Sequence, residues 1–348
     1  RRPPRSTLFP YTTLFRSVIA LPDPVGRVTK METRPNGLQI GRKTVPLGVI
    51  AIIYEARPNV TVDAAALCLK SGNVCILRGG KESIRSNRCA AALMRGALES
   101  VGLPEDCISL VQDTSRESAN ELMHLNGYVD VLIPRGGAGL IRAVAREASV
   151  PVIRTGEGVC HIYVDSDANL DMAAEILYNA KCSRPSVCNA VECVLIHEAV
   201  AAEFLQKAVP PLDWKHVELR CDEASLKLLG ARARAAEDAD WDAEYDDYIL
   251  AVHVVRDLDE AMEFIAAHST QHSECIVTES YAKAQRFLDE VDAAAVYVNA
   301  STRFTDGGEF GMGAEIGIST QKMHARGPMG LEELTSYKYI VYGNGQVR

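Results

Sequence analysis

The sequence lacks the features that would place the protein in a membrane or on nucleic acid. No apolar run in its 348 residues approaches the ~18 residues that a membrane-spanning helix needs. The chain is not basic either, because 37 Lys and Arg stand against 46 Asp and Glu, a net charge of −9. This charge argues against nucleic acid or an anionic membrane as the main partner, although it is compatible with a local basic pocket.

The cysteine pattern indicates neither a structural metal site nor a secreted disulfide scaffold. The ten cysteines are scattered, and no two of them have the C-x2-C spacing of a zinc site. The N-terminal segment contains no apolar core of a signal peptide, since Pro10 interrupts it. We therefore expect no metal, free thiols and a cytoplasmic location.

What remains is the balance of an ordinary globular protein, with 47% apolar and 24% charged residues in a length that favours two domains. Residues 1–17 (RRPPRSTLFPYTTLFRS) contain two near-copies of one motif, Ser6-Thr7-Leu8-Phe9 and Thr12-Thr13-Leu14-Phe15. They resemble a translated adapter sequence, and we expect a non-native tail here. A natural disordered tail is the alternative.

Apolar runs alternate with helical patterns in two series. In the first, we expect strands at 45–54, 73–77 and 129–133 and helices at 60–70, 83–99 and 138–147. In the second, we expect strands at 161–164, 191–196, 250–255, 275–278 and 295–299, a helix from an Asp167 cap to Ala180, and helices at 198–208, 257–267 and 280–290. The acidic stretch 237–247 should be a loop or an exposed helix face, and 301–330 an ordered loop. This alternation predicts an α/β fold with parallel sheets covered by helices.

Two basic, glycine-rich loops follow strands and precede helices. They are Leu77-Arg78-Gly79-Gly80-Lys81 and Pro134-Arg135-Gly136-Gly137-Ala138-Gly139. Glycines let backbone N–H groups approach a phosphate, and Arg and Lys add donors. Each loop alone could be a tight turn, and neither is a strict G-x-G-x-x-G, but the pair favours a phosphate-rich cofactor.

Arg57 and Asn59 follow the first long strand. Ligands of doubly wound sheets lie at the carboxyl ends of the strands, so both residues are candidates for binding a carboxylate or an oxyanion. The alternative is that Pro58 and Asn59 only begin the next helix.

Cys188 lies in the polar loop Lys181-Cys182-Ser183-Arg184-Pro185-Ser186-Val187-Cys188-Asn189, between a helix and a strand. A thiolate is a strong nucleophile, and a polar or cationic, partly open setting favours it. A structural cysteine is the usual alternative for a single cysteine. A metal cluster with Cys182 and Cys193 does not fit any common zinc spacing.

Several longer motifs together resemble the γ-glutamyl phosphate reductase family of the aldehyde dehydrogenase superfamily. They are the Cys188 loop, Pro46-Leu47-Gly48-Val49-Ile50, YEARPNVTVDAA (54–65), LRGGKES (77–83), LIPRGGAGLI (132–141) and VNASTRFTDGGEFGMGAEIGISTQKMHARGPMGLEELTSYKY (298–339). The similarity runs from about Ala20 to the C-terminus.

This resemblance implies a reaction. The thiolate of Cys188 would attack L-glutamyl 5-phosphate and expel phosphate, and the thioester would take a hydride from NADPH to release glutamate 5-semialdehyde. The enzyme would be a phosphorylating, NADP-dependent oxidoreductase of proline biosynthesis, with glutamate 5-kinase as a pathway partner. A hydrolytic aldehyde dehydrogenase and an inactive truncated fragment are the alternatives.

The resemblance also implies roles for the other candidate residues. Arg78, Gly79, Lys81, Arg135, Gly136, Gly137 and Gly139 would bind the cofactor. Lys81 stands where many NAD-linked relatives have an acidic residue, which suits the 2′-phosphate of NADP. Arg57, Asn59, Asn189, Ser301 and Arg303 would bind the substrate or an oxyanion.

Two departures from the superfamily pattern carry consequences. Thr155 stands where hydrolytic members place a glutamate base, so water should not be activated against the thioester. The helical segment that the family carries before Asp23 is missing from the sequence, which implies an N-terminal truncation.

The implied fold is aldehyde-dehydrogenase-like, with two doubly wound, Rossmann-like α/β domains. The cofactor domain would cover 18–165 and include an oligomerisation hairpin at 30–45. The catalytic domain would cover 166–302. Residues 303–330 would return to the cofactor domain, and 331–348 would complete an oligomerisation arm. We therefore expect a homo-oligomer.

Two histidines remain open. His272 is either a functional residue or a loop histidine whose hydrogen bonds are satisfied, whereas His161 enters an apolar strand and fits a core or edge position better. His324 and Arg326 in the tail could reach an active site or brace it.

Overall fold

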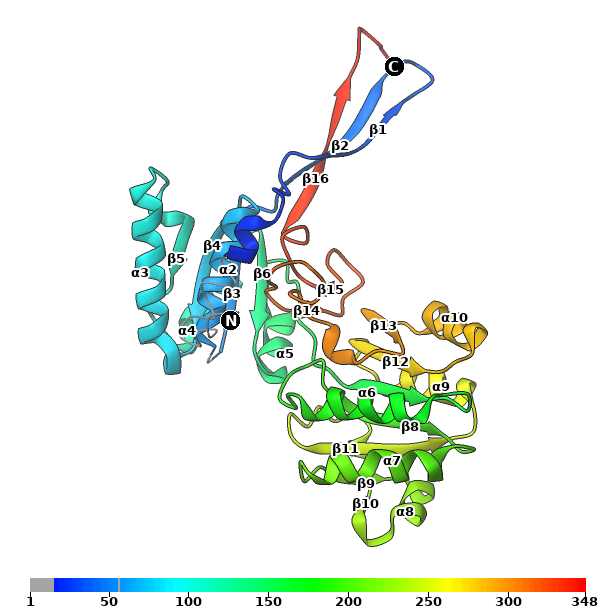
Figure 1. The fold of residues 1–348 in the computed structure, drawn as a ribbon. Coiled ribbons are helices and arrows are strands. Elements are labelled where there is room, and N and C mark those ends of the chain that lie inside the picture. The colour runs from blue at the N-terminus through cyan, green and yellow to red at the C-terminus, as the bar shows by residue number, and fades with distance from the viewer. Residues whose placement is uncertain (1–15, 56) are drawn as a thin grey trace, which may run out of the picture. The chain divides into compact units, whose positions relative to one another are not determined.

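The computed structural model describes residues 16–55 and 57–348 (Figure 1). Most of the predicted N-terminal tail lies outside this part, although Ser17 Oγ donates a hydrogen bond to the carbonyl of Gly313. The chain forms two compact units. The described part of the first unit comprises 16–155, 307–317 and 321–348 without residue 56, and the second comprises 156–306 and 318–320.

The first unit contains a four-stranded sheet with strand order β5-β4-β3-β6, in which every pairing is parallel. Its strands are β3 (Val49–Tyr54), β4 (Val74–Gly79), β5 (Ile108–Leu110) and β6 (Val131–Arg135). Its helices are α2 (Pro58–Lys70), α3 (Ile84–Ser100), α4 (Arg116–Met123) and α5 (Ala138–Glu147), with short 3-10 helices η1 (Lys81–Ser83) and η2 (Glu105–Cys107).

Alternate residues of β3 pack into two different cores. Ile50 and Ile52 lie in a cluster with residues of α2 and α3, whereas Ala51 and Ile53 lie in a cluster with residues of α4 and α5. Successive side chains of a strand point to opposite faces, so helices must cover both faces of the sheet. This explains why β3 is a nearly continuous apolar run.

The strand predicted over 45–54 is in fact two strands. Gly48, with φ +125°, separates β2 (Gln39–Pro46) from β3, and an added Cβ there would lie 2.0 Å from Asp130 Oδ2. The turn therefore requires glycine. β2 instead joins β1 (Val28–Thr33) and β16 (Thr335–Tyr342) in an antiparallel sheet with order β1-β2-β16.

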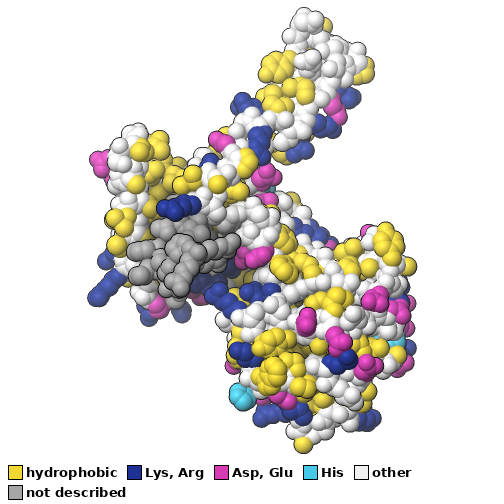
Figure 2. All heavy atoms as spheres, in the orientation of Figure 1, with side chains coloured by type: hydrophobic (Ala, Val, Ile, Leu, Met, Phe, Trp, Pro, Cys, Tyr) yellow, Lys and Arg dark blue, Asp and Glu magenta, His cyan; other side chains and the backbone are white. Residues whose placement is uncertain are grey.

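This three-stranded sheet exposes large apolar side chains, and Figure 2 shows hydrophobic surface along it. They are Val28, Met31, Tyr337, Tyr339, Val341 and Tyr342. All six residues of β1 are exposed, so this sheet contributes little to the core of its unit. The arm predicted at 30–45 and 331–348 thus consists of paired strands, while its role in an oligomer stays a prediction.

The second unit contains a seven-stranded parallel sheet with order β10-β9-β11-β8-β7-β12-β13. Its strands are β7 (Cys160–Val164), β8 (Val191–His197), β9 (Glu218–Cys221), β10 (Arg234–Ala235), β11 (Ile249–Val255), β12 (Ser273–Val277) and β13 (Ala295–Val298). Its helices are α6 (Leu170–Cys182), α7 (Ala201–Asp213), α8 (Glu223–Leu229), α9 (Leu258–His268) and α10 (Tyr281–Glu290), with short helices η3 (Gly230–Arg232), η4 (Asp238–Asp240) and η5 (Thr302–Phe304).

The two faces of this sheet are again covered separately. Val194 and Ile196 of β8 pack with residues of α6 and α7, whereas Cys193 and Leu195 pack with residues of α9 and α10. Both units therefore have the α/β architecture that the alternation of apolar runs predicts.

Several boundaries differ from the sequence prediction. Asn169 rather than Asp167 caps α6, because its side chain accepts a hydrogen bond from Met172 N at 3.1 Å. α7 begins at Ala201 and continues to Asp213 through two prolines, and β9 and α8 were not predicted. Strand β7 belongs to the second unit because it pairs with β8 and β12, so the division falls at Thr155 rather than near residue 165.

The tail at 301–330 is largely irregular, with η5 and two short strands, β14 (Ile318–Ser319) and β15 (Gly327–Pro328). It is well packed nonetheless, since Ile316, Ile318 and Met329 are buried. Among the described residues, no helix is both long enough and apolar enough to cross a bilayer.

Candidate active site

Cys188 is half-buried in the loop that joins α6 to β8. Its carbonyl oxygen accepts a hydrogen bond from Cys160 Sγ at 3.2 Å, at the start of the neighbouring strand β7. Burial raises the pKa of the Cys160 thiol well above its ordinary value, and that thiol therefore stays protonated as a donor. Cys160 thus holds the backbone of Cys188 and does not act as a second thiolate.

Gly158 lies directly against the same carbonyl. A Cβ added at Gly158 would come within 1.5 Å of the Cys188 oxygen, and the atoms involved are all backbone. The amide of Gly158 also donates to Glu244 Oε1 at 2.9 Å. Only glycine permits this approach, so Gly158 helps to set the position of Cys188. The sequence patterns did not single out Gly158.

Asn189 fastens the next part of the loop to η5. Its Nδ2 donates to the backbone carbonyls of Thr305 at 2.9 Å and Arg303 at 3.3 Å. The backbone carbonyl of Asn189 accepts a hydrogen bond from Thr302 Oγ1 at 2.8 Å. Both hydrogens of the amide are therefore engaged by backbone oxygens. In this geometry Asn189 positions the loop, while its predicted role as a substrate or oxyanion ligand stays a prediction.

Arg303 bridges the two ends of the loop. Its Nη1 donates to Asn189 Oδ1, and its Nε donates to Ser183 Oγ at 3.1 Å. Burial lowers the pKa of Arg303, and the positive charge of Arg184 lowers it further. Ser301 is buried and caps η5 by accepting a hydrogen bond from Arg303 N at 3.3 Å. Of the predicted site residues, the structure thus brings Cys188, Asn189, Ser301 and Arg303 together.

A buried ion pair joins the two elements from which this loop emerges. Lys181, in the last turn of α6, donates to Glu192 Oε2 of β8 at 2.6 Å, and the two side chains are only 0% and 1% exposed. Burial raises the pKa of Glu192 above its ordinary value, although Lys181 opposes the rise. The one sequence signal for this pair is Glu192 itself, a charged residue within an otherwise apolar strand.

The predicted substrate residues of the first unit lie at the start of α2. Arg57 is the N-cap residue, and Pro58 occupies the first turn. Asn59 Nδ2 donates to Asp63 Oδ2 at 3.0 Å within the helix. Burial raises the pKa of Asp63 to about 6, although Asn59 and Arg135 oppose the rise. Asp63 was not predicted, and its Oδ1 is buried without a hydrogen-bond partner.

The first glycine loop combines a braced arginine with an exposed lysine. Arg78 Nη2 donates to the carbonyls of Thr114 and Ser115 at 2.7 and 2.6 Å, so it holds the segment before α4. A Cβ at Gly79 would lie 2.2 Å from Asn87 Nδ2, which explains this glycine by packing. Lys81 is exposed, and no side chain caps η1 or α3. The start of these helices therefore fits an anionic ligand.

A carboxylate already lies at the second glycine loop. Glu55 Oε2 accepts a hydrogen bond from Gly137 N at 2.8 Å, and a Cβ at Gly136 would lie 2.5 Å from the same oxygen. Around Gly139 nothing lies within 4 Å of such a Cβ. Arg135 Nε is buried without a partner. The loop thus provides donors, but a phosphate at the start of α5 would compete with Glu55.

Thr155 is buried and donates through Oγ1 to the carbonyl of Pro134 at 2.9 Å. A Cβ at Gly317 would lie 2.6 Å from Thr155 Cγ2. A hydroxyl bonded in this way is no general base, and the site leaves little room for a longer acidic side chain.

Both histidines that the sequence left open are fully buried. His272 Nδ1 contacts Ser273 Oγ at 2.8 Å and Cys160 Sγ at 3.7 Å. Since Cys160 Sγ donates to the Cys188 carbonyl, His272 is linked to that carbonyl through Cys160. His161 Nδ1 contacts Glu274 Oε2 at 3.0 Å. In the tail, His324 Nε2 contacts the carbonyl of Glu333 at 2.6 Å. The described residues include no group of three or more His, Cys, Asp or Glu that could hold a metal ion.

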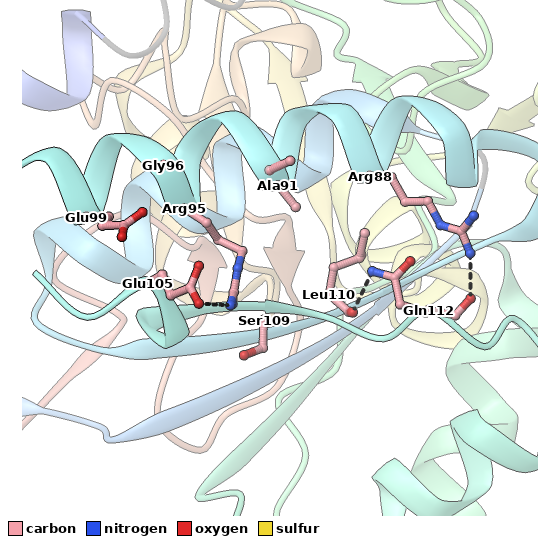
Figure 3. Close-up of a pocket in the computed structure, with 10 residues that line it drawn as sticks. Arg88, Ala91, Arg95, Gly96, Glu99, Glu105, Ser109, Leu110 and Gln112 are labelled. Carbon is pink, nitrogen blue, oxygen red and sulfur yellow. Dashed lines mark hydrogen bonds and ion pairs between the residues drawn. The ribbon is translucent and has the colours of Figure 1, made fainter.

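A pocket of about 600 Å³ lies in the first unit between α3 and the segment 105–112 (Figure 3). Arg95 crosses it to pair with Glu105 at 3.1 Å, and Arg88 donates to the carbonyl of Gln112 at 3.4 Å. None of the predicted site residues lines this pocket. Arg88, Arg95 and Glu105 thus have partners within the wall, and the pocket lies apart from the predicted site residues.

Comparison with known proteins agrees with this geometry. The model of the "Aldehyde dehydrogenase family" matches residues 14–222. The "Gamma-glutamyl phosphate reductase" of Clostridium beijerinckii is 61% identical over 333 residues, which cover 96% of this chain and 80% of that protein. The chain belongs to the γ-glutamyl phosphate reductases of the aldehyde dehydrogenase family.

Solved structures place this chain in the same fold. The crystal structure of γ-glutamyl phosphate reductase from Thermotoga maritima matches with a TM-score of 0.94 and 49% identity, over 97% of this chain and 81% of that one. An acetylating aldehyde dehydrogenase from Geobacillus thermoglucosidasius, at 18% identity and a TM-score of 0.74 over 97% of this chain and 82% of that one, shares the fold. The predicted aldehyde-dehydrogenase-like fold is confirmed.

Proposed function

We propose that the protein reduces L-glutamyl 5-phosphate to L-glutamate 5-semialdehyde and phosphate with NADPH, through a thioester on Cys188. The observation that carries this proposal is the half-buried Cys188, held by backbone contacts on both sides, in a chain 61% identical to a γ-glutamyl phosphate reductase. Such a reaction supplies the second step of proline biosynthesis, after a kinase that makes the acyl phosphate.

The chain itself provides the nucleophile and its orientation. The Cys188 thiolate attacks the acyl carbon, the bond from this carbon to the phosphate oxygen breaks, and phosphate leaves with the electron pair. A guanidinium at Arg303, fixed through Asn189 beside Cys188, favours the thiolate. Asn189 and Ser301 keep η5 in place, whereas Arg303, Arg57 and Asn59 contact the substrate.

The first unit provides the cofactor residues. The bound NADPH supplies the hydride that reduces the thioester. Lys81 and the uncapped start of α3 hold phosphate groups, and Lys81 selects the 2′-phosphate of NADP. Arg78 braces the segment before α4, and Arg135, Gly136, Gly137 and Gly139 line the second loop, where Glu55 sets how closely an anion approaches.

Thr155 provides no base that would activate water against the thioester. Thr155 Oγ1 is buried and donates its hydrogen to a carbonyl, so it cannot remove a proton from water. Phosphate rather than water is therefore the acceptor in the reverse direction.

The arm of β1, β2 and β16 provides a surface for self-association. An exposed β-sheet that carries several large apolar side chains is favoured when a second copy covers it. We infer a cytoplasmic homo-oligomer with free thiols.

The test is the reverse reaction with glutamate 5-semialdehyde, NADP and phosphate. The unchanged protein should reduce NADP only when phosphate is present. Cys188→Ala should lose at least about 10³-fold in kcat, since covalent catalysis is removed. Cys89→Ala, an exposed cysteine of α3, is the matched control and should keep its activity. Turnover by Cys188→Ala would exclude the covalent route, and phosphate-independent oxidation would indicate a hydrolytic enzyme.

A further inference from the structure

Arg303 is a half-buried cation whose side chain donates hydrogen bonds only to neutral groups among the described residues. Its guanidinium donates to a hydroxyl, Ser183 Oγ, and to an amide oxygen, Asn189 Oδ1. Among the ion pairs of the described residues, no carboxylate pairs with Arg303 or with the exposed Arg184, although Asp306 lies near enough to favour the charged guanidinium. A partly buried charge without a paired counter-ion is costly, so an anion at this position would be stabilised.

The position of this cation relative to the nucleophile is well defined. Asn189 follows Cys188 directly, and its amide is anchored to Thr305 O at 2.9 Å. Ser183 fixes the other side of the guanidinium and precedes Arg184. Two neutral partners therefore orient the planar group next to Cys188 and leave its charge available.

We propose that Arg303, together with Arg184, forms the subsite that binds the phosphoryl group of the acyl phosphate and, in the reverse direction, inorganic phosphate. This inference rests on the proposed function. A guanidinium presents a fork of donors that matches two phosphate oxygens, and a second cation suits a doubly charged ligand.

The phosphoryl group fits this place better than the α-carboxylate of the substrate. It is bonded to the carbon that Cys188 attacks, so it must lie close to the sulfur, as a group held through Asn189 does. The α-carboxylate lies at the far end of the glutamyl chain. When the carbon–oxygen bond breaks, the electron pair moves to the departing phosphate and its negative charge grows. A fixed cation there stabilises the transition state more than the ground state.

The electrostatics around Arg303 agree with an anionic ligand. Burial and then Arg184 lower the pKa of Arg303, whereas Asp306, Cys188 and Cys160 act in the opposite direction. A bound phosphate would relieve the repulsion between the two arginines. It would thereby join the loop after α6, which carries Arg184, to the η5 helix that carries Arg303.

The decisive measurement is the reverse reaction with phosphate varied at saturating semialdehyde and NADP. Arg184 is exposed, and its side chain makes no hydrogen bond to the part of the chain that the structure describes, so Arg184→Met should leave the fold intact. Its KM for phosphate should rise about tenfold, which corresponds to ~1.4 kcal/mol, while the KM for semialdehyde changes less than about twofold. Arg303→Lys keeps the charge but loses the fork, and should raise the KM for phosphate and lower kcat. Arg234→Met, an exposed arginine of β10, is the matched control and should change neither constant.

A second measurement does not require turnover. Inorganic phosphate should slow the alkylation of Cys188 by iodoacetamide in the unchanged protein, and much less in Arg184→Met. If Arg184→Met and Arg303→Lys raise the KM for semialdehyde but leave the KM for phosphate unchanged, the subsite binds the α-carboxylate and the inference is wrong. An unchanged protein without phosphate-dependent oxidation would instead contradict the proposed function itself.

Discussion

The buried carboxyl groups of the two units have different hydrogen-bond partners. In the second unit, Glu192 pairs with Lys181 at 2.6 Å and Asp165 accepts hydrogen bonds from Lys283 at 3.0 Å. In the described part of the first unit, the neutral amide of Asn59 is the one hydrogen-bond donor to the Asp63 carboxyl group. Internal ion pairs therefore stabilise the unit that carries the nucleophile, whereas the strand ends of the other unit keep a carboxyl group without a paired cation.

The difference shows how a rigid site and an adaptable site are built from the same architecture. The Cys188 loop is held at Cys188 and Asn189 by partners within its own unit, so changes there should disturb geometry. At the ends of β3 and β6 the groups are less completely paired, so changes there should alter electrostatics and leave the fold intact. Four substitutions separate these two kinds of effect.

Gly158→Ala should have the largest effect. The new Cβ would meet the Cys188 carbonyl at 1.5 Å, and both segments lead within three residues into the paired strands β7 and β8, which limits how far they can shift. We expect a loss of more than about 4 kcal/mol in the free energy of unfolding, measured by urea titration, and little residual activity. Gly139→Ala in the first unit is the control. The surroundings of Gly139 are open and the residue lies in α5, so the Gly139→Ala variant should be up to about 1 kcal/mol more stable than the unchanged protein. Equal effects of both changes would contradict the comparison.

Lys181→Met should come second, because it leaves Glu192 buried without its cation. We expect a loss of about 3 kcal/mol at neutral pH, by thermal or urea unfolding. The double change Lys181→Met with Glu192→Leu should recover most of this loss, since both charges are removed together. If the double variant were as unstable as the single one, packing rather than charge would explain the effect.

Asp63→Asn should change the pH dependence of stability. The pKa of Asp63 is raised to about 6 in the folded protein, above its ordinary value near 3.8, so the folded state binds the proton more tightly. This contribution is present at low pH and is lost as pH rises through 6. When the pH is raised from 4 to 7, the free energy of unfolding of Asp63→Asn should therefore increase by about 2 kcal/mol relative to that of the unchanged protein. Unfolding curves at these two pH values measure it, and a constant difference would show that Asp63 has an ordinary pKa.

Asn169→Ala should have the smallest effect on stability. It tests whether Asn169, the observed cap of α6, matters more than Asp167, the predicted cap. Loss of the cap hydrogen bond to Met172 N should cost about 1 kcal/mol. Asp167→Ala loses only a partly exposed ion pair with Lys283, and should cost less than about 0.5 kcal/mol. The reverse order in urea unfolding would restore Asp167 as the important residue at this helix start.

The parts predicted well from sequence depend on local patterns. The buried run of β3, the strand-helix alternation and the Cys188 loop are visible because apolar periodicity and turn residues act over a few neighbouring positions. The parts missed depend on contacts between distant segments. Gly158 touches a residue 30 positions later, and Asn189 bonds carbonyls 114 and 116 positions away. The turn at Gly48 was missed because its cause, Asp130, is distant in sequence.

By itself, the sequence determined the α/β class, the two series of strands and helices, and the nucleophile with its family. These follow from residue type and local spacing, which act before the chain is folded. Only the tertiary structure decided that Asn189 holds its loop, that Glu55 lies at the second glycine loop and that Arg303 is a cation without a paired carboxylate beside Cys188. Burial and charge pairing depend on which distant segments come into contact. These contacts form only when the helices pack on the two faces of each sheet.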